Sequence, residues 1–178
     1  EAYERKLISK DAKFDRYAAG GLELFKEPEK RGLKVFLGTA RCVQCHNGPL
    51  FSDGLFHNLG LSRQNGPNVP PHDFGAETAY PGLLEDPFNG AGPYSDAPEA
   101  GRTKLLKLKA PDRGQFRTPS LRNVQLTAPY FHDGSRTGLT SVIEFYRVGG
   151  DPAGTFDGPR DALIQPIPTS EFQPTQVF

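Results

Sequence analysis

The 178-residue chain lacks any long apolar run and any excess of charge of one sign. A membrane-spanning helix needs about 20 consecutive, mostly apolar residues, and no segment of the sequence approaches that length. Lys and Arg together number 21, as do Asp and Glu, so the formal net charge is zero. Nucleic-acid-binding domains carry basic patches and a high pI. The sequence therefore predicts neither a membrane span nor a nucleic-acid partner.

Cysteine is scarce, since the chain has only two. Both lie in Cys42-Val43-Gln44-Cys45-His46, and C-x-x-C-H is the attachment sequence of a c-type haem. Two cysteines three positions apart on a helical turn face the same way, so each thiol can form a thioether with one vinyl group of the porphyrin. The His46 imidazole can then ligate the iron from the proximal side. The motif predicts one covalent, redox-active haem c in this chain.

Three alternatives to haem compete for this motif. A zinc site needs four nitrogen or sulfur ligands, so it would have to recruit His57, His72 or His132 at irregular spacings. A thioredoxin-like C-x-x-C should lie beside a strand–helix–strand pattern, and none surrounds this one. A disulfide is the third alternative. The adjacent histidine favours haem over all three.

Methionine is absent altogether. Ligation of haem iron by methionine and histidine, which is usual in electron-carrying cytochromes c, is therefore impossible within this chain. The sixth position of the iron must hold another histidine, a tyrosine or a small molecule, or it must be open.

Helices are expected in three places. Residues 1–25 read as short helical pieces, and an amphipathic helix is predicted from Glu27 to Leu37, with Gly38 as its C-cap. A short helix is predicted from Leu139 to Tyr146, ended by Gly149-Gly150. The rest of the chain reads mainly as loop.

Glycine, with 20 residues, and proline, with 17, are abundant. Between Gly48 and about Gln115 their turn-forming dipeptides predict a long excursion with few regular elements. Residues 64–100 are expected to form a surface loop. The tail from Asp151 is rich in proline. Residues 1–178 are predicted to form a single haem domain.

The chain begins Glu-Ala-Tyr, without methionine, so it is expected to be processed or cut from a longer protein. Covalent haem c is attached outside the cytoplasm. We therefore expect a periplasmic location in a bacterium.

Three stretches carry a family resemblance: AYERKLIS…FDRY, RGLKVFLGTARCVQCHNGPLFSDGLFHNLGL and FRTPSLRNVQLTAPYFHDGSRTGLTSVIEFYRVGG. They cover most of residues 1–63 and 115–150 and resemble the second, C-terminal haem domain of the bacterial dihaem cytochrome c peroxidases and MauG-type enzymes. Such proteins carry two C-x-x-C-H motifs, one per domain, and this chain has one. It looks like half of the enzyme. The resemblance implies a mainly α, cytochrome c-like haem domain, here with a long irregular loop insertion.

The resemblance also implies roles for individual residues. His46 matches the proximal iron ligand, and Tyr146 matches the position of the sixth ligand, which is methionine in the peroxidases proper and tyrosine in MauG-like members. A phenolate is a hard anionic donor that favours oxidised iron and lowers the potential relative to methionine. Thr127 and Pro129 match residues whose backbone carbonyls bind calcium between two domains, and carbonyl oxygens suit such a hard cation. The remaining calcium ligand would come from the missing first domain.

Other polar residues are candidates for contacts with the haem. Arg117 and Arg122 are predicted to pair with its propionates, which favour bidentate donors, although either could be an ordinary surface arginine. His132 could hydrogen-bond to a propionate or to the ligand loop, or could be a structural turn residue. It is also the main rival to tyrosine as the sixth ligand. His57 is expected to be structural, near the haem edge, and His72 to be a solvated loop residue.

Two functions are consistent with these features. In the first, an N-terminal companion domain carries a haem that reacts with hydrogen peroxide. The six-coordinate haem of this chain then relays oxidising equivalents to an electron donor or protein substrate. No catalytic residue is expected in this half. The alternative is a monohaem c-type electron-transfer protein without peroxidase activity, although simple carriers are usually smaller and use methionine. A zinc-stabilised binding module is a third hypothesis. A red colour, which haem gives to a protein, would exclude it.

Overall fold

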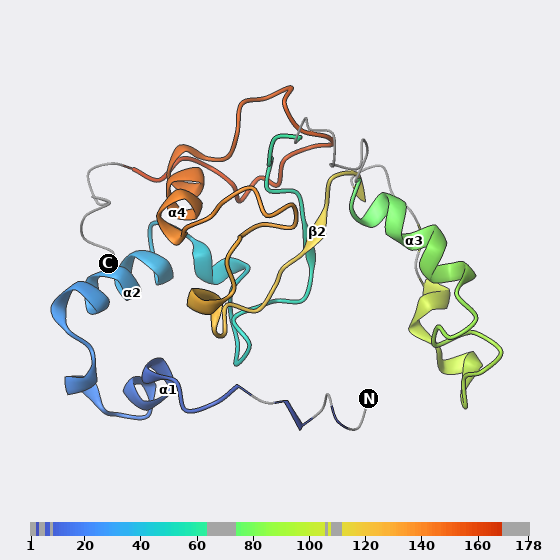
Figure 1. The fold of residues 1–178 in the computed structure, drawn as a ribbon, viewed down its shortest axis with the longest axis horizontal. Coiled ribbons are helices and arrows are strands. Elements are labelled where there is room, and N and C mark those ends of the chain that lie inside the picture. Colours follow the sequence, from blue (N-terminus) through green and yellow to red (C-terminus); the bar gives the residue numbers. More distant parts are fainter. Residues whose placement is uncertain are drawn as a thin grey trace. The chain divides into compact units, whose positions relative to one another are not determined.

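The computed structural model describes residues 3, 6–7, 9–63, 74–105, 107 and 112–168. Short α-helices, 3-10 turns and one two-stranded sheet make up its regular structure (Figure 1). No helix of this described part is long and apolar enough to cross a membrane. The chain divides into two compact units. The first comprises residues 1–53, 119–148 and 166–178, and the second comprises residues 54–118 and 149–165.

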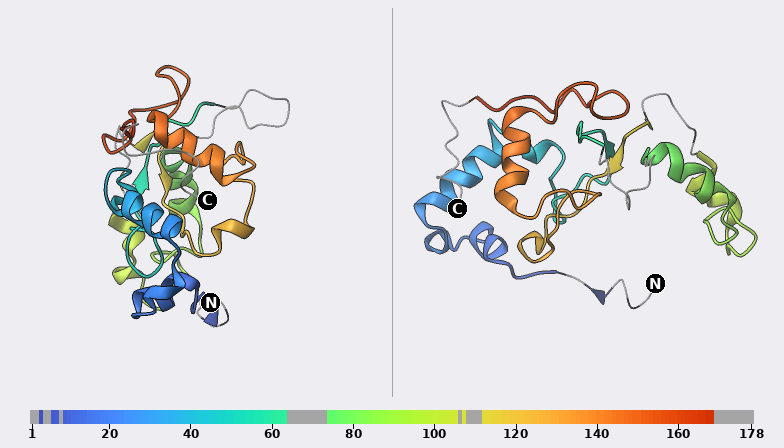
Figure 2. Two further views of the ribbon diagram at one scale, coloured as in Figure 1. Left: turned by 90° about the vertical axis from the view of Figure 1, so that its left-hand side faces the viewer. Right: turned by 45° about the horizontal axis from the view of Figure 1, so that its top comes forward.

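The first unit holds the longest helix and the cysteine motif. Its elements are α1 (Lys13–Ala18), η2 (Leu22–Leu24), α2 (Glu27–Leu37), η3 (Cys42–Gln44), η7 (Val124–Leu126) and α4 (Leu139–Val148). Figures 1 and 2 show α4 beside the turn η3. The predicted helix over 27–37 is confirmed at both ends, and the one predicted from Leu139 continues two residues further than expected. The pieces expected within residues 1–25 are α1 and η2.

Local hydrogen bonds set the ends of α2. The Glu29 carboxylate accepts a hydrogen bond from the backbone N–H of Lys26 at 2.8 Å, which satisfies a donor that the first turn leaves without a helical partner. At the other end, the N–H of Gly38 donates to the carbonyl of Lys34 at 2.9 Å. Four residues therefore separate the end of the helix at Leu37 from Cys42.

Aromatic rings form much of the apolar packing in the first unit. The Phe14 ring lies 5.0 Å from that of Phe51 and 6.3 Å from that of Phe25, and Tyr17 stacks on Phe25 at 4.1 Å. Among the described apolar residues of this unit, only Phe145 and Ile167 are buried, at 3% and 5% exposure. The α1–α2 end of the unit is thus held by ring contacts at its surface rather than by a large core.

The second unit is built on a short antiparallel pair of strands. β1 (Phe56–His57) pairs with β2 (Phe116–Arg117), so that Phe56 lies opposite Arg117 and His57 opposite Phe116. The N–H of Thr118 donates to the carbonyl of Leu55 at 2.9 Å and extends this ladder. The two ends of the intervening segment are thereby held together.

Asn58 is the most buried polar residue of the second unit, at 3% exposure. Its amide nitrogen donates to the carbonyls of Arg113 at 3.2 Å and Asp157 at 2.6 Å, and its oxygen accepts from the N–H of Gly60 at 2.9 Å. Gly158 has φ +71°, and a side chain there would collide with the carbonyl oxygen of Arg113. One amide thus joins three separate stretches of chain.

The expectation of few regular elements between Gly48 and Gln115 is wrong for residues 76–85. Helix α3 (Ala76–Glu85) occupies this stretch, with Pro81 inside it. The Pro81-Gly82 pair reads locally as a turn, but the helix survives because its last carbonyls find a partner beyond it. The side-chain amide of Asn89 donates to the carbonyls of Leu83 at 2.9 Å and Leu84 at 3.1 Å.

Two 3-10 turns follow α3, η4 (Pro98–Ala100) and η5 (Arg102–Leu105). The exposed rings of Phe88 and Tyr94 stack at 4.9 Å between α3 and these turns. The surface loop predicted for residues 64–100 is therefore wrong where α3 lies. Residues 64–73, which include His72, lie outside the described residues, so the loop predicted for that part and the solvated position of His72 stay predictions.

Replacing Asn58 with Ala is expected to lower the free energy of unfolding by about 1–3 kcal/mol, because two carbonyls and one N–H lose a buried partner. Urea unfolding followed by circular dichroism measures the change. Gln165→Ala is the control, since Gln165 is exposed and its amide bonds to the nearby carbonyl of Ala162. It should change stability by no more than about 0.5 kcal/mol. Equal losses in the two variants would contradict the role given to Asn58.

Candidate functional site

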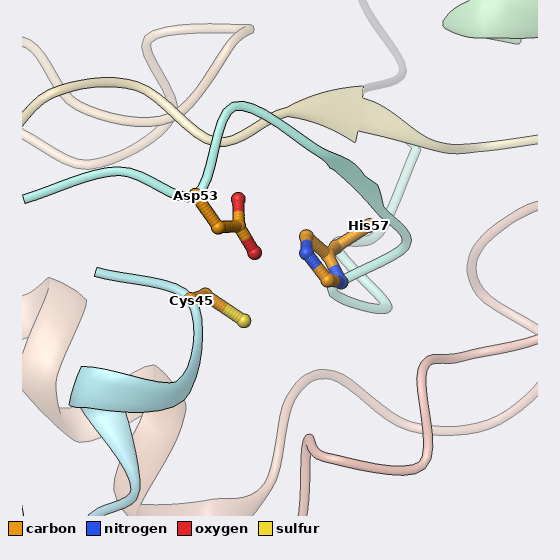
Figure 3. Close-up of side chains that lie close together, drawn as sticks. All are labelled: Cys45, Asp53 and His57. Carbon is orange, nitrogen blue, oxygen red and sulfur yellow. The ribbon is translucent and has the colours of Figure 1, made fainter. Parts of the chain in front are cut away.

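The C-x-x-C-H motif folds as a single tight turn. The backbone N–H groups of Cys45 and His46 both donate to the carbonyl of Cys42, at 3.3 and 2.8 Å. The N–H of Asp53 returns to the carbonyl of Cys45 at 2.8 Å, and Figure 3 shows the Cys45 sulfur near the Asp53 carboxylate. The three motif residues that carry chemistry therefore come from five consecutive positions on one rigid turn.

Neither cysteine is in a disulfide, and both are half-buried. The Cys42 thiol lies 3.6 Å from the carbonyl oxygen of Ala40, to which it can donate a weak hydrogen bond. Burial raises the pKa of the Cys42 thiol, so it remains protonated near neutral pH. Two free cysteines, three positions apart, are the groups that form thioethers with the two vinyl groups of a porphyrin.

The His46 ring is oriented by a backbone carbonyl. Its Nδ1 lies 2.9 Å from the carbonyl oxygen of Phe51. A carbonyl can only accept, so Nδ1 carries the proton and Nε2 carries the lone pair. This is the tautomer that a metal-ligating histidine needs, with its second nitrogen held by a hydrogen bond.

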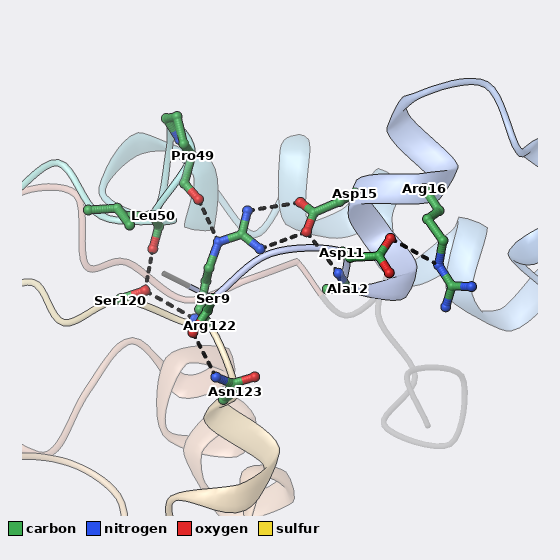
Figure 4. Close-up of polar contacts among 10 residues, drawn as sticks. All are labelled: Ser9, Asp11, Ala12, Asp15, Arg16, Pro49, Leu50, Ser120, Arg122 and Asn123. Atoms are coloured by element: carbon green, nitrogen blue, oxygen red, sulfur yellow. Dashed lines mark hydrogen bonds and ion pairs between the residues drawn. The ribbon is translucent and has the colours of Figure 1, made fainter. Parts of the chain in front are cut away.

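Two side chains hold the loop that follows the motif, as Figure 4 shows. Arg122 donates through Nε to the carbonyl of Pro49 at 2.7 Å, and Ser120 donates through Oγ to the carbonyl of Leu50 at 2.6 Å. The Arg122 guanidinium also lies 5.4 Å from the centre of the Phe51 ring. Residues 49, 50 and 51 are thus each contacted from the segment 120–122.

Arg122 also forms a bidentate ion pair with Asp15 of α1. Nη1 and Nη2 each lie 2.8 Å from one carboxylate oxygen, and the two side chains are only 14% and 28% exposed. The hydrogen bonds from Arg122 lower the pKa of the Asp15 carboxyl from 3.8 to about 2. The pair likewise raises the pKa of Arg122. With these partners, Arg122 fits a structural role, and its predicted pairing with a haem propionate stays a prediction.

Tyr146 lies on α4 within an aromatic group. Its ring is 5.3 Å from that of Phe145 and 6.2 Å from that of Phe131. Burial raises the pKa of the Tyr146 hydroxyl well above its ordinary value of 10, and the charges that Cys42 and Cys45 would carry as thiolates raise it further. The hydroxyl therefore lies within electrostatic reach of both cysteines. The structure brings Tyr146 and the motif together within the first unit.

A cavity of about 810 Å³ opens beside His46 in the first unit. This volume falls within the range of about 300–1,000 Å³ that small-molecule sites occupy. Its wall is mainly apolar, with Phe14, Phe25, Leu33, Phe36 and Phe51 among the lining residues. Its lining residues include His46 but not Cys42, Cys45 or Tyr146, so the cavity adjoins the motif turn without being formed by the whole predicted ligand set.

The other residues predicted in this unit are exposed. His132, Thr127 and Pro129 all lie at the surface of the segment between η7 and α4. Thr127 donates through Oγ1 to the carbonyl of Val124 at 3.1 Å. Their predicted roles, in haem contact for His132 and in calcium binding for the other two, stay predictions.

Arg117 and His57 belong to the second unit. Arg117 is exposed on β2, and its predicted pairing with a propionate stays a prediction. His57 lies on β1, where its Nδ1 is 2.6 Å from a carboxylate oxygen of Asp161 and its side chain is 13% exposed. This contact fits the structural role expected for His57.

Phe51 and Asp15 are site residues that sequence reasoning missed. Phe51 acts through its carbonyl, and a backbone acceptor leaves no signature in the side-chain sequence. Asp15 meets Arg122 across 107 positions of sequence, a pairing that no local pattern reveals. The Gly48-Pro49 turn signal directly after the motif was the only indication that the chain folds back there.

The donor set fits a covalent haem. Two thiols and a histidine with its Nε2 lone pair share one turn, an apolar cavity adjoins that histidine, and a tyrosine oxygen lies within electrostatic reach of the thiols. These features place the first unit in the class of c-type haem-binding domains.

Comparison with known proteins narrows this class to a family. No family model matches the chain. It is 37% identical over 177 residues to cytochrome-c peroxidase IdrP1 of Denitromonas iodatirespirans, covering 91% of this chain and 42% of that protein. It is 33% identical over 148 residues to methylamine utilization protein MauG of Methylophilus methylotrophus, covering 82% of this chain and 34% of that protein.

A solved structure from the same group of proteins is also similar to this chain. A MauG-like protein associated with microbial copper homeostasis superposes with a TM-score of 0.64 at 28% identity, covering 99% of this chain and 52% of that one. The chain belongs to the family of bacterial dihaem cytochrome c peroxidases and MauG. The names of these relatives, cytochrome-c peroxidase and MauG, imply a covalent c-type haem. The chain spans about two fifths of the length of the curated relatives it matches.

Asp15→Asn is expected to lose stability relative to the wild type near pH 5 and to lose progressively less as the pH falls through 4 towards 2. The folded-state pKa of Asp15 is lowered to about 2, so its contribution is complete above the unfolded value and disappears on protonation. Urea unfolding at several pH values measures the difference. Asp11→Asn, at an exposed residue 3.9 Å from Arg16, is the matched control. A difference between Asp15→Asn and the wild type that is constant from pH 5 to 2 would contradict the assignment.

Tyr146→Phe is expected to remove an oxygen ligand while keeping the ring contacts with Phe145 and Phe131. The haem iron should become high-spin, bind cyanide more readily and shift to a higher potential. Absorption and EPR spectra, with cyanide titration, measure these changes. Tyr17→Phe, at a ring stacked on Phe25, should leave them unaltered. A spectrum that is unchanged in Tyr146→Phe but lost in His132→Ala would move the assignment to His132.

Proposed function

We propose that this chain is the electron-relaying C-terminal haem domain of a MauG-like dihaem peroxidase, which uses hydrogen peroxide to oxidise an electron donor or a protein substrate. The observation that carries the proposal is the pairing, in one unit, of a single C-x-x-C-H turn with a buried tyrosine hydroxyl near its cysteines. The short span of the chain relative to its relatives supports its assignment to one half of such an enzyme.

The chain's own residues would hold the haem in place. Cys42 and Cys45 would form the thioethers, His46 would ligate through Nε2, and Tyr146 would supply an oxygen ligand. When bound, haem iron supplies reversible one-electron chemistry. Burial favours the neutral form of the Tyr146 hydroxyl, and a bound cation would reverse that preference. The tyrosine would therefore lose its proton only when the iron is present.

A relay role is proposed because His46 and Tyr146 would both hold the iron. A haem held in this way would supply electron transfer, and an N-terminal companion domain would supply the haem that reacts with peroxide. The one C-x-x-C-H motif in this chain is also compatible with the alternative, a monohaem electron-transfer protein. Restoring a companion domain discriminates between the two.

A periplasmic location and a calcium ion belong to the same proposal. Thr127 and Pro129 lie at the surface of the first unit, which suits a cation shared with a second domain. Their backbone carbonyls would supply hard oxygen ligands.

The intact mass of the native chain is expected to show one covalent haem, which the Cys42→Ala/Cys45→Ala double variant should lack.

Steady-state assays should find slow turnover of hydrogen peroxide by the chain alone. Addition of an N-terminal haem domain should raise the rate by orders of magnitude, because that domain provides an open iron. Fast turnover by the isolated chain would reject the relay role. A colourless, folded protein containing zinc would reject haem altogether.

A further inference from the structure

The residue that orients His46 has an unusual backbone conformation. Phe51, whose carbonyl accepts the hydrogen bond from His46 Nδ1, has φ +50°, in the left-handed region. A bulky residue other than glycine adopts this region only at a cost of about 1–3 kcal/mol, and it persists there when its surroundings hold it. The nearest bonds within the loop are local, from the N–H of Phe51 to the carbonyl of Gly48 at 3.1 Å and from that of Ser52 to Asn47 at 2.9 Å.

Contacts from outside the loop hold the two carbonyls that precede Phe51. Arg122 Nε bonds to the carbonyl of Pro49 at 2.7 Å, and Ser120 Oγ bonds to that of Leu50 at 2.6 Å. Figure 4 shows both bonds reaching the loop from one short segment. With these two peptide groups held, the chain has little freedom to rotate the third, which carries the acceptor for His46.

Asp15 holds Arg122 in turn. Its carboxylate receives Nη1 and Nη2 at 2.8 Å each, in the bidentate geometry that fixes the plane of a guanidinium. Asp15 also accepts the backbone N–H of Ala12 at 2.9 Å, so the ion pair is anchored to the start of α1. The Phe14 ring next to Asp15 meets the Phe51 ring edge-on at 5.0 Å.

We propose that Asp15, Arg122 and Ser120 are positioning residues for His46. They hold the left-handed Phe51 so that its carbonyl accepts the proton of Nδ1, and this hydrogen bond sets the orientation and donor strength of the ring. The inference rests on the proposed function, in which His46 ligates the haem iron.

We expect these contacts to affect the ratio of ferric to ferrous haem iron. A hydrogen bond from Nδ1–H to a carbonyl makes Nε2 a stronger electron donor, which favours ferric over ferrous iron. Loosening the loop weakens that bond and shifts the balance towards ferrous iron. The shift should be visible without any measurement of enzyme activity.

The test is a redox titration of the haem-loaded chain in four variants and the wild type. Arg122→Lys loses the bidentate fork and the Nε contact but keeps the charge. Asp15→Asn loses the ion pair, and Ser120→Ala loses the bond to the Leu50 carbonyl together with the acceptor for the backbone N–H of Arg122. Arg16→Lys is the matched control. Arg16 lies on α1, the helix that carries Asp15, and its exposed side chain is 3.9 Å from Asp11.

We expect Arg122→Lys to lower the ferric-to-ferrous ratio at fixed solution potential, since partners behind a metal ligand tune its donor strength. Asp15→Asn and Ser120→Ala should shift it less but in the same direction, with a matching change in the EPR g-values. Arg16→Lys should match the wild type. If Arg122→Lys does not fold, the two milder variants decide the outcome.

Two results would overturn the inference, and they can be told apart. If intact mass shows covalent haem in every variant while potentials and g-values equal those of the wild type, the positioning role is wrong and the proposed function stands. If the wild type carries no covalent haem, the proposed function fails, and this inference fails with it.

Discussion

The hydrogen bond between the His46 ring and the carbonyl of Phe51 is the contact on which the candidate site depends. It fixes which ring nitrogen carries the proton, and so which nitrogen can ligate a metal. The covalent motif brings a histidine to the right place in the chain, but sequence alone does not choose its tautomer or its ring plane. The fold makes that choice through the five residues after the motif, 47–51, the last of which carries the acceptor carbonyl.

Tyr146 is held in a different way from His46. Tyr146 is held by ring contacts with Phe131 and Phe145 rather than by hydrogen bonds to a loop. Phe145 is one of the few apolar side chains that the described part of the chain buries. A polar network therefore holds the histidine, and an aromatic group holds the tyrosine. The position of His46 thus depends on directional hydrogen bonds, whereas that of Tyr146 depends on the packing of aromatic rings.

Local signals in the sequence predicted the elements that carry the site. The helix Glu27–Leu37 has its capping glutamate, its apolar face and its terminal glycine within eleven residues, and the helix from Leu139 ends at a glycine pair. The family resemblance added Tyr146. Helix α3 was missed because Pro81 and Gly82 resemble a turn, and the amide that satisfies the helix end comes from Asn89. The Arg122–Asp15 pair joins residues far apart in sequence, and such contacts leave no periodic pattern.

The pairing of β1 with β2 bears on how this domain can diverge. The two strands bring the ends of the intervening segment together. The length of that segment therefore affects the free energy of folding mainly through the entropy of closing the loop. That entropy grows with the logarithm of length, and a doubling costs about 0.6 kcal/mol. Changes in the length of this segment are thus expected to cost little where they leave Asn58, Gly60 and Arg113 in place, since the Asn58 amide ties these residues together. In evolution, the segment can change in length while the Cys42–His46 turn stays the same.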